Sequence, residues 1–320
     1  MKPMRRKIKV FQLVLWTVLG VGALFLLLKS VSLNDLIKTF QGISPIYLVL
    51  GFILYFIIYL LRTWRFSFLL RNKIKFQKLF SISCIHNFFN MLLPARLGEL
   101  SYAFLLKKEG VKITKSFSHI ILSRIYDLLG IMLLFFLSLA VFLADLRWKA
   151  LALIATAAML VLLTMFFKIL VIIKKIISLL KSKHKLIKAL QKFMDQLLYE
   201  STLFSTEERI KLIALSLLLN TLMYLFGYII VKAMGVDLSI WAIFVGGTLA
   251  FLTTILPIQG MFNIGTMELG WTFSYVLVGM TQNQAILTGL AYHLVNIVFT
   301  TVFFALGLIL KAFLSRRDKR

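Results

Sequence analysis

The sequence predicts an all-α integral membrane protein, with about six full transmembrane helices and two re-entrant helical hairpins that enter from opposite faces. Three observations support this fold class. Of the 320 residues, 60% are hydrophobic and only 15% are charged, whereas soluble domains are about half apolar and a quarter charged. Several apolar stretches have about the 20-residue length that crosses a hydrocarbon core of about 30 Å. Basic residues gather beside particular stretches, as their preference for cytoplasmic loops requires.

This composition excludes a soluble enzyme, a disordered chain, and a collagen-like, coiled-coil or secreted disulfide-rich protein. The chain has 37 Lys and Arg against 12 Asp and Glu, a formal net charge of +25. In a soluble protein that excess would indicate a nucleic-acid partner. In a membrane protein it follows from the topology, because cytoplasmic loops collect basic residues. We therefore expect no nucleic-acid partner.

Sequence motifs for cofactor chemistry are missing. Cys84 is the single cysteine, and the four histidines form no H-E-x-x-H pair. The sequence also contains no P-loop, no G-x-G-x-x-G and no G-x-S-x-G pattern. We therefore expect no metal, no cofactor and no catalytic residue. These absences argue against an enzyme but leave enzymatic activity an open question.

Full spans are expected where the apolar stretches have suitable length, over residues 10–28, 45–61, 117–143, 150–173, 212–231 and 284–310. The first of these follows a basic N-terminal segment, as the apolar core of a signal peptide would. Lys29 follows it directly with no small-residue cleavage pattern, so we interpret it as a retained span. Two further apolar regions, 79–106 and 239–280, are interrupted by Pro and Gly.

Region 79–106 is expected to enter and return on the cytoplasmic side. Its flanks are basic, with Arg62, Arg65, Arg71, Lys73, Lys75 and Lys78 before it and Lys107, Lys108, Lys112 and Lys115 after it. Both flanks are therefore predicted to be cytoplasmic. The second arm, 97–106, covers only about 15 Å, half of the hydrocarbon core. A re-entrant hairpin fits this length, and two full spans do not.

Region 239–280 is expected to enter and return from the outside. Lys232 and Asp237 are the only charges close before it, and residues 279–284 after it carry none. The last span, in contrast, ends in the basic segment 311–320, which places both termini in the cytoplasm. The arms of this region are longer, so two full spans stay the alternative to a hairpin.

We interpret residues 1–320 as a single polytopic membrane domain. Its first half, 10–173, contains the hairpin 79–106, and its second half, 210–310, contains the hairpin 239–280. Interrupted segments in both halves are typical of the central site of a transporter. The linking segment 174–209 places lysines between apolar residues at three- and four-residue spacing. We expect it to lie on the anionic inner leaflet, with an acidic partner as the alternative.

The tip of the first hairpin carries the first group of candidate site residues. Ionisable residues inside a membrane cost about 2.5–3.5 kcal/mol each on insertion scales, so they mark functional sites. Pro94 ends the first arm, and Gly98 allows a turn or a close approach. The polar residues that could line a headgroup site here are Asn87, Asn90, Arg96 and Glu99. The alternative is a turn held by an internal Arg96–Glu99 pair.

A second group lies in the span 117–143. Arg124 and Asp127 are three residues apart and share one helix face. They could pair with each other. They could also pair with other charges, Arg124 with Glu99 or Glu268 and Asp127 with Arg96. Structural pairing and ligand contact are both consistent with this pattern.

The third group interrupts region 239–280. Pro257, Gly260 and Gly265 break the helix, and Asn263 tolerates left-handed geometry. Glu268 follows one turn into the next arm, where it could bind an ammonium group, carry a proton or cap backbone N–H groups. Interhelical hydrogen bonds are expected from three polar residues in the spans, Asn220, His293 and Asn296.

The pattern Asn-x-x-Leu-Pro-x-Arg-x-Gly-Glu over residues 90–99 resembles the hallmark of the lysylphosphatidylglycerol synthase transmembrane-region family. This family is also called flippase-like and includes the N-terminal module of the multiple peptide resistance factor. The later Arg124-x-x-Asp127 and Pro257…Gly265-x-x-Glu268 patterns resemble its second and third motifs, and the similarity runs from the first span to the last. Where the family usually has consecutive glycines, this chain has Phe262, Asn263 and Ile264 before Gly265.

The resemblance implies a membrane lipid translocase, flippase- or scramblase-like, for a phospholipid, an aminoacylated phospholipid or a polyprenyl-linked lipid. Well-known relatives fuse this module to a soluble aminoacyltransferase that makes lysylphosphatidylglycerol, which contributes to antimicrobial peptide resistance. No such domain is expected here, because the sequence ends shortly after the last span. The alternative is an integral membrane enzyme, or an accessory subunit of a transferase, that acts on lipid-linked substrates.

In the translocase interpretation, Arg96 and Arg124 would hold a lipid phosphate. Glu99, Asp127 and Glu268 would hold an amino group or balance the arginines. The expected partners are membrane lipids and anionic inner-leaflet headgroups, with a separate soluble transferase and a second copy of the chain as protein partners. The expected location is the plasma membrane, in a prokaryote by analogy with the family.

Overall fold

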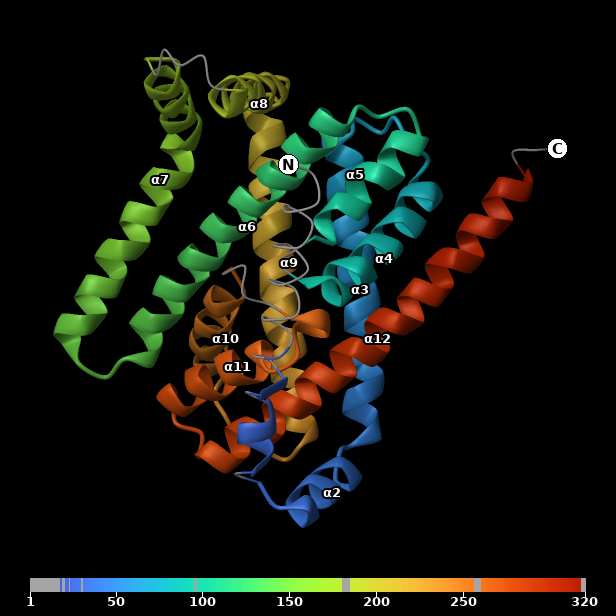
Figure 1. Cartoon of the computed structure of the whole chain (residues 1–320). Helices are drawn as coiled ribbons and strands as arrows, with labels where there is room; N and C mark the ends of the chain where they lie inside the picture. The colour runs from blue at the N-terminus through green and yellow to red at the C-terminus, as the bar shows by residue number, and fades with distance from the viewer. Residues whose placement is uncertain are drawn as a thin grey trace. The chain divides into compact units, whose positions relative to one another are not determined.

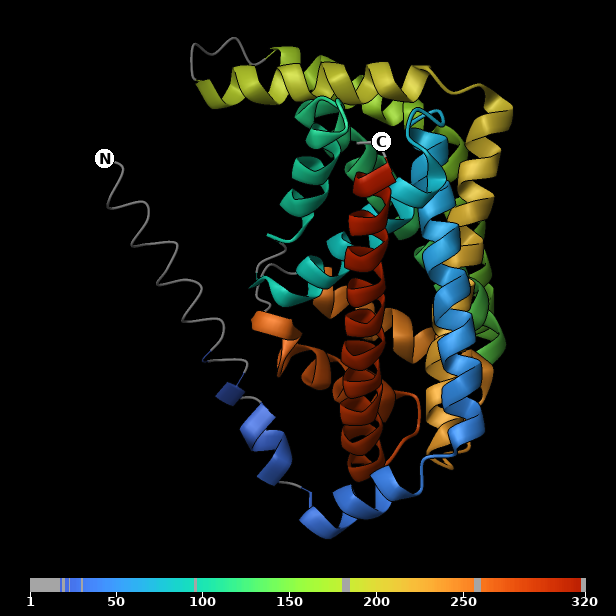
Figure 2. The same ribbon diagram turned by 90° about the vertical axis from the view of Figure 1, so that its right-hand side faces the viewer.

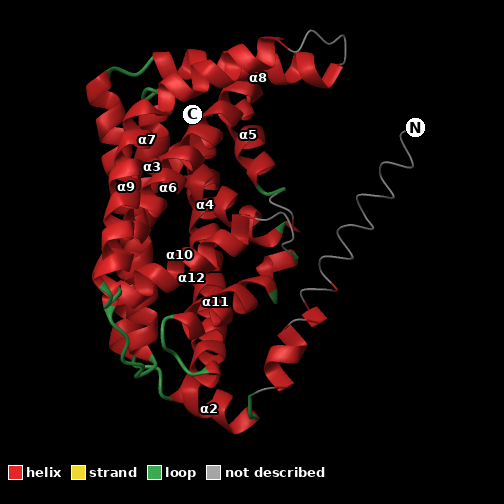
Figure 3. Ribbon diagram, turned by 90° about the vertical axis from the view of Figure 1, so that its left-hand side faces the viewer, coloured by secondary structure: helices red, strands yellow, loops and turns green. Residues whose placement is uncertain are grey.

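The computed structural model describes residues 18, 21–22, 24–29, 31–94, 97–179, 185–255 and 260–317. These residues form helices and connecting loops, with no strand among them (Figure 3). The prediction of an all-α fold is therefore confirmed for the described part of the chain.

The helices are numbered as in Figure 1. In chain order they are α2 (Leu33–Gln41), α3 (Pro45–Leu69), α4 (Phe76–Leu92), α5 (Glu99–Lys108), α6 (Ile113–Phe142), α7 (Leu146–Leu179), α8 (Lys185–Thr202), α9 (Thr206–Ala233), α10 (Ile240–Ile255), the 3₁₀ turn η2 (Met261–Asn263), α11 (Thr266–Leu277) and α12 (Gln282–Arg317).

Four described helices, α3, α6, α9 and α12, are long and apolar enough to cross a membrane. They cover four of the stretches expected as full spans, 45–61, 212–231, 284–310 and all but the last residue of 117–143. The stretch 150–173 lies within α7, a helix of 34 residues. Most of the stretch 10–28 lies outside the described residues. The total of six full spans stays a prediction.

The two interrupted regions form pairs of short helices. In the first region α4 has 17 residues and α5 has 10, and in the second α10 has 16 and α11 has 12. At 1.5 Å per residue all four are shorter than a hydrocarbon core of about 30 Å. These lengths favour hairpins over full spans in both regions. Entry and return on one face of the membrane stays a prediction.

The chain divides into two compact units, each of which combines segments far apart in the sequence. Unit 1 comprises Met1–Thr63, Lys75–Tyr102 and Leu222–Arg320. Unit 2 comprises Trp64–Ile74 and Ala103–Thr221. The tips of both interrupted regions belong to unit 1, and the Arg124–Asp127 motif belongs to unit 2.

Within unit 1, α12 is one continuous helix that packs along α4 and α11 (Figure 2). Phe88 of α4 stacks on Phe304 of α12 with ring centroids 4.1 Å apart. The Ser81 hydroxyl donates to the Gly307 carbonyl at 2.7 Å. Such close helix contacts at small residues, with hydroxyl bonds between the helices, are typical of membrane bundles. These contacts hold α12 in place against α4, and α12 in turn positions the second tip.

The two helices of the second interrupted region approach each other at glycines. A Cβ atom at Gly246 would lie 3.2 Å from the Tyr275 ring, and one at Gly270 would lie 2.1 Å from the Thr253 hydroxyl. Any larger residue there would push the helices apart, so these small residues permit the tight packing of α10 on α11.

Within unit 2, the amphipathic helix α8 packs its apolar side against α6 and α7. Met194, Leu197 and Leu198 are buried in a cluster with Leu122 and Leu170. The lysines on the opposite side of α8, Lys188 and Lys192, are exposed. The apolar stripe seen in the sequence therefore serves helix packing. Contact of the basic side with an anionic leaflet stays a prediction.

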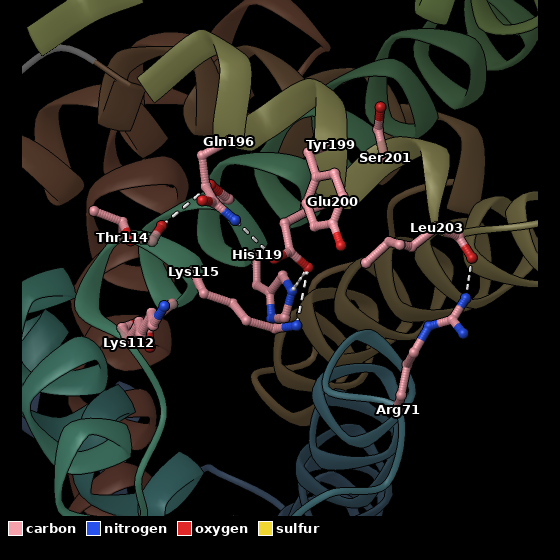
Figure 4. A network of polar contacts seen from close by, with 12 residues as sticks. Arg71, Lys112, Thr114, Lys115, His119, Gln196, Tyr199, Glu200, Ser201 and Leu203 are labelled. Atoms are coloured by element: carbon pink, nitrogen blue, oxygen red, sulfur yellow. Dashed lines mark hydrogen bonds and ion pairs between the residues drawn. The ribbon is translucent and has the colours of Figure 1, made fainter. Parts of the chain in front are cut away.

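A buried polar network fixes the C-terminal end of α8 (Figure 4). The Glu200 carboxylate accepts hydrogen bonds from Lys115 Nζ and His119 Nε2, both at 3.1 Å, and from Gln196 Nε2 at 2.9 Å. Burial raises the pKa of Glu200, but the bonds from His119 and Lys115 lower it by more, so the pKa lies below its ordinary value. The ionised carboxylate therefore stabilises the docking of α8 on α6.

Replacing Glu200 by Gln is expected to loosen this docking, because the charged hydrogen bonds contribute about 1.5–3 kcal/mol each. Hydrogen–deuterium exchange over residues 190–202 should become about tenfold to hundredfold faster. A carboxyl with a lowered pKa stabilises above its unfolded pKa and loses that contribution as the pH falls through the folded value. Wild-type exchange should therefore accelerate below about pH 4.5, and the variant should lack this acid response.

The control is Asp195→Asn on the same helix. Asp195 pairs with Lys174 at 2.8 Å, but both side chains are about half exposed, so this pair contributes at most about 1 kcal/mol. If Asp195→Asn loosens α8 as much as Glu200→Gln does, the buried network is not what holds the helix.

Candidate functional site

The first tip is the turn that joins the end of α4 to the start of α5. It is built on a close contact between these two helices. A Cβ atom at Gly98 would lie 2.2 Å from both the Phe89 carbonyl oxygen and the Asn90 Cα. Only glycine fits at this distance from backbone atoms. The Ser101 hydroxyl donates to the Gly98 carbonyl at 2.6 Å, and His86 Nδ1 lies 3.2 Å from the same hydroxyl.

The other residues of the first motif surround this contact. Pro94 is buried directly after α4 ends, as expected of a helix-ending proline. Asn87 and Asn90 lie half-buried on α4, and Glu99 opens α5, where a carboxylate suits the positive end of the helix dipole. Arg96 lies outside the described residues, so its pairing and its role stay predictions.

Asn90 has an amide oxygen, Oδ1, that is buried and has no hydrogen-bond partner within the described part of the chain. The second tip has the same feature at Asn263. A buried polar atom without a partner costs about 1–3 kcal/mol, so native proteins rarely keep one without a role.

The second tip has three left-handed residues in a short space. Phe262 has φ 54°, Asn263 has φ 59° and Gly265 has φ 78°. Gly and Asn adopt this region readily, whereas it costs a residue such as Phe about 1–2 kcal/mol. The missing glycines noted in the sequence thus leave Phe262 in a geometry that suits glycine, and contacts elsewhere must stabilise it. Gly260 is buried before η2, and Pro257 lies outside the described residues.

Glu268 and His293 supply such a contact. The Glu268 carboxylate accepts a hydrogen bond from the Gly265 N–H at 2.7 Å through Oε2. Glu268 therefore caps the start of α11, one of the roles expected from the sequence. Its other oxygen lies 2.6 Å from His293 Nδ1. The second ring nitrogen of His293, Nε2, lies 2.8 Å from the Phe262 carbonyl oxygen. His293 also forms the expected interhelical hydrogen bond, since it joins α12 to α11.

Within unit 1, the second tip lies beside α4, the helix that leads into the first tip. Turn η2 packs against α4, and the Phe262 ring contacts the Phe88 ring edge-to-face with centroids 6.3 Å apart. Residues from the first and third motifs, more than 150 positions apart in the sequence, therefore lie on neighbouring elements.

The second motif contains a mostly buried ion pair in unit 2, with the Arg65 and Asp127 side chains 6% and 15% exposed. Asp127 of α6 pairs through both carboxylate oxygens with Arg65 of α3, with Nη2 and Oδ2 3.0 Å apart. Arg65 Nη1 also donates to the Ser216 hydroxyl at 2.9 Å, and Asn220 Nδ2 donates to the Asp127 carbonyl at 3.1 Å. Among the residues that the structure describes, the ion-pair partner of Asp127 is Arg65. Arg124 lies half-buried on the same helix.

The family model described as "Lysylphosphatidylglycerol synthase TM region" matches residues 12–303, which is most of the chain. The chain belongs to the lysylphosphatidylglycerol synthase transmembrane-region family. Comparison with curated proteins and with solved structures finds no match. The three motifs that carried the resemblance in the sequence all lie inside the matched range.

In this member of the lysylphosphatidylglycerol synthase transmembrane-region family, two site residues escape sequence reasoning. The sequence places Arg65 in the cytoplasmic flank, but α3 continues to Leu69 and Arg65 is only 5% exposed. The signal was the run of apolar residues that follows it, Phe66, Phe68, Leu69 and Leu70. The sequence predicts an interhelical hydrogen bond for His293, but it does not identify Glu268 as the partner.

Proposed function

We propose that the chain is a membrane lipid translocase, flippase- or scramblase-like, that moves a lipid between leaflets through a polar path between the two hairpin tips. The candidate lipids are a phospholipid, an aminoacylated phospholipid and a polyprenyl-linked lipid. Membership of the family supports a lipid-related membrane function. Two pairs of short helices, with the second tip beside α4, support transport, because broken helices build the central sites of transporters.

The single observation that carries the proposal is the pair of buried amide oxygens at the tips. Asn90 Oδ1 and Asn263 Oδ1 are inaccessible and lack a hydrogen-bond partner within the described ranges. Each could accept a bond from a hydroxyl or ammonium group. Lipid headgroups with glycerol, sugar or amino-acid groups carry such donors. In this proposal a headgroup that passes the tips donates to these oxygens while the acyl chains stay in lipid.

The proposal includes an orientation. Both termini face the cytoplasm of a plasma membrane, and the first hairpin enters from that side while the second enters from the outside. The positive-inside preference of the flanking lysines and arginines supports this orientation. The exposed Lys188 and Lys192 of α8 then face the anionic inner leaflet.

The test is lipid movement in liposomes that contain the purified chain and a fluorescent lipid of one candidate class. The wild-type protein should move the label faster than protein-free liposomes do. Asn90→Leu and Asn263→Gly should each slow it about tenfold, the effect of one lost hydrogen bond of about 1.4 kcal/mol. Glycine keeps the left-handed backbone at 263 available.

Asn296→Leu is the matched control. Asn296 is also an amide in a span of unit 1, but its oxygen already accepts a bond from the Tyr55 hydroxyl at 2.6 Å. This variant should lose stability and keep the translocation rate per folded molecule. If all three variants slow lipid movement equally, the two tip asparagines have no specific role. If the wild-type protein moves no candidate lipid faster than protein-free liposomes do, the translocase function is rejected.

A second candidate function is a part in lipid modification, as a membrane enzyme or as an accessory subunit of a transferase. The observation that favours it is the matching family's description as the membrane region of a synthase. Mass spectrometry of lipids incubated with the pure chain tests it. A chemically altered lipid would favour the enzyme, and co-purification with a soluble transferase would favour the accessory subunit.

A further inference from the structure

Both ring nitrogens of His293 are engaged by oxygen atoms. Nδ1 lies 2.6 Å from Glu268 Oε1, and Nε2 lies 2.8 Å from the Phe262 carbonyl oxygen. The side chains of Glu268 and His293 are only 4% and 3% exposed. Water is therefore excluded from the pair, and its hydrogen bonds are set by the protein atoms around it.

This geometry determines how many protons the pair holds. A backbone carbonyl can only accept, so Nε2 must carry a proton. One more proton must lie between Nδ1 and Oε1, on either atom, because two lone pairs would repel at that distance. The pair then has a net charge of zero, as an imidazolium with a carboxylate or as a neutral imidazole with a carboxylic acid. Zero net charge makes its burial tolerable.

Loss of one proton is incompatible with the observed contacts. The single remaining ring proton of His293 could serve Glu268 or the Phe262 carbonyl, but not both. The pair would also carry a buried net charge of −1, which costs free energy unless a cation compensates it. Deprotonation must therefore break a contact or bring in a cationic group.

Loss of the contact to Phe262 would affect the tip most, because the backbone there is strained. Phe262 has φ 54° inside η2, a region that a bulky residue occupies only when neighbouring contacts hold it. Without the bond from His293, the segment from Gly260 to Gly265 would be free to relax. The same segment carries Asn263, one of the two tip asparagines.

We propose that Glu268 and His293 form the binding site for one exchangeable proton, and that its uptake and release close and open the second tip during lipid movement. The coupling to lipid movement rests on the proposed function, whereas the proton site itself does not. The exchange also gives the tip a preference for its cargo, because the deprotonated pair attracts a cationic headgroup where the protonated pair does not.

No other titratable group shares this site within the described residues, since Glu268 and His293 bond only to each other, to Gly265 and to Phe262. Helix α10 has no titratable side chain among its described residues. Helices α2 and α4 pack against α12, and α4 also packs against η2. Their titratable groups are Asp35 and Lys38 of α2 and Lys78, Cys84 and His86 of α4, while α11 and α12 themselves also carry Tyr275, Tyr292, Lys311, Arg316 and Arg317. Tyr55 of α3 bonds Asn296 of α12, and Tyr224 of α9 bonds Thr248 of α10. His86 contacts Ser101, and Tyr275 reaches the Ile243 carbonyl.

The first test measures hydrogen–deuterium exchange over residues 260–266 of the full-length chain as a function of pH, corrected for the intrinsic rate. In the wild type the opening equilibrium should rise up to tenfold per pH unit above one transition, as release of a single proton requires. In Glu268→Gln the response should vanish. The amide oxygen can still accept the Gly265 N–H and the amide nitrogen can donate to Nδ1, so the tip stays closed.

Thr288→Val is the control for this test. It removes the bond from Trp271 Nε1, 3.1 Å long, that joins the same two helices without a titratable group. This variant should keep the wild-type pH response. A pH-independent tip in the wild type, or a normal response in Glu268→Gln, would overturn the proton site, and the wild-type measurement needs no variant to fold.

The second test measures lipid movement in liposomes under an imposed pH gradient. The wild-type rate should change with the gradient, and the Glu268→Gln rate should not. If the tip responds to pH but no lipid moves at any pH, the proton site stands and the translocase function falls. If lipid moves at a rate that no gradient alters, the translocase stands and proton coupling is refuted.

Discussion

Replacing either partner of the Arg65–Asp127 pair is expected to destabilise unit 2 by about 3–5 kcal/mol, because the remaining charge is left buried without a partner. Arg65 is 5% exposed, and its guanidinium bonds Ser216 as well as both oxygens of Asp127. Arg65→Leu and Asp127→Leu should each lower the midpoint of chemical or thermal unfolding strongly. Hydrogen–deuterium exchange in α6 reports the same loss locally.

The double variant Arg65→Leu with Asp127→Leu distinguishes a buried ion pair from a loss of packing. Replacing both charges by apolar residues is often neutral, since neither is then left unpaired. The double variant should therefore recover most of the stability that the single variants lose, which gives a large coupling energy in a double-mutant cycle. Additive losses in the double variant would show that the two charges act separately.

The sequence predicts well the features that depend on local chemistry. Length and hydropathy predict α3, α6, α9 and α12 as helices able to span a membrane. Pro94 marks the end of α4 because proline lacks a backbone donor. Gly98 marks a close approach because only glycine has no Cβ.

The sequence could not predict which side chains pair with each other, because tertiary packing determines the pairs. The sequence offers two candidate arginines for Asp127, Arg96 and Arg124. The residue that pairs with it is Arg65, which the sequence places in the cytoplasmic flank. Glu268 and His293 are 25 residues apart, and only the packing of α11 on α12 brings them together. Phe262 has a left-handed backbone, which local preference disfavours in a bulky residue. A hydrogen bond from His293 to its carbonyl oxygen offsets this cost.

Gly98→Ala is expected to disrupt the first tip more than any other single methyl group added in the described part of unit 1. The new Cβ would lie 2.2 Å from the Phe89 carbonyl oxygen and from the Asn90 Cα, and 2.4 Å from the Asn90 nitrogen. These are backbone atoms of a helix, so no side-chain rotation relieves the clash. The start of α5 must move away from α4, at a cost at or above the upper end of the usual overpacking range, about 3 kcal/mol.

That movement separates Ser101 from His86 and shifts Asn90 and Glu99 relative to each other. Lipid movement should therefore be lost along with stability, and proteolysis near residues 93–98 should become faster. Gly227→Ala is the matched control, because the nearest atoms to a Cβ there are 3.9 Å away and alanine favours a helix by up to about 1 kcal/mol. If the two variants unfold at the same temperature and move lipid equally well, the contact at Gly98 does not hold the tip, and the motif needs another explanation.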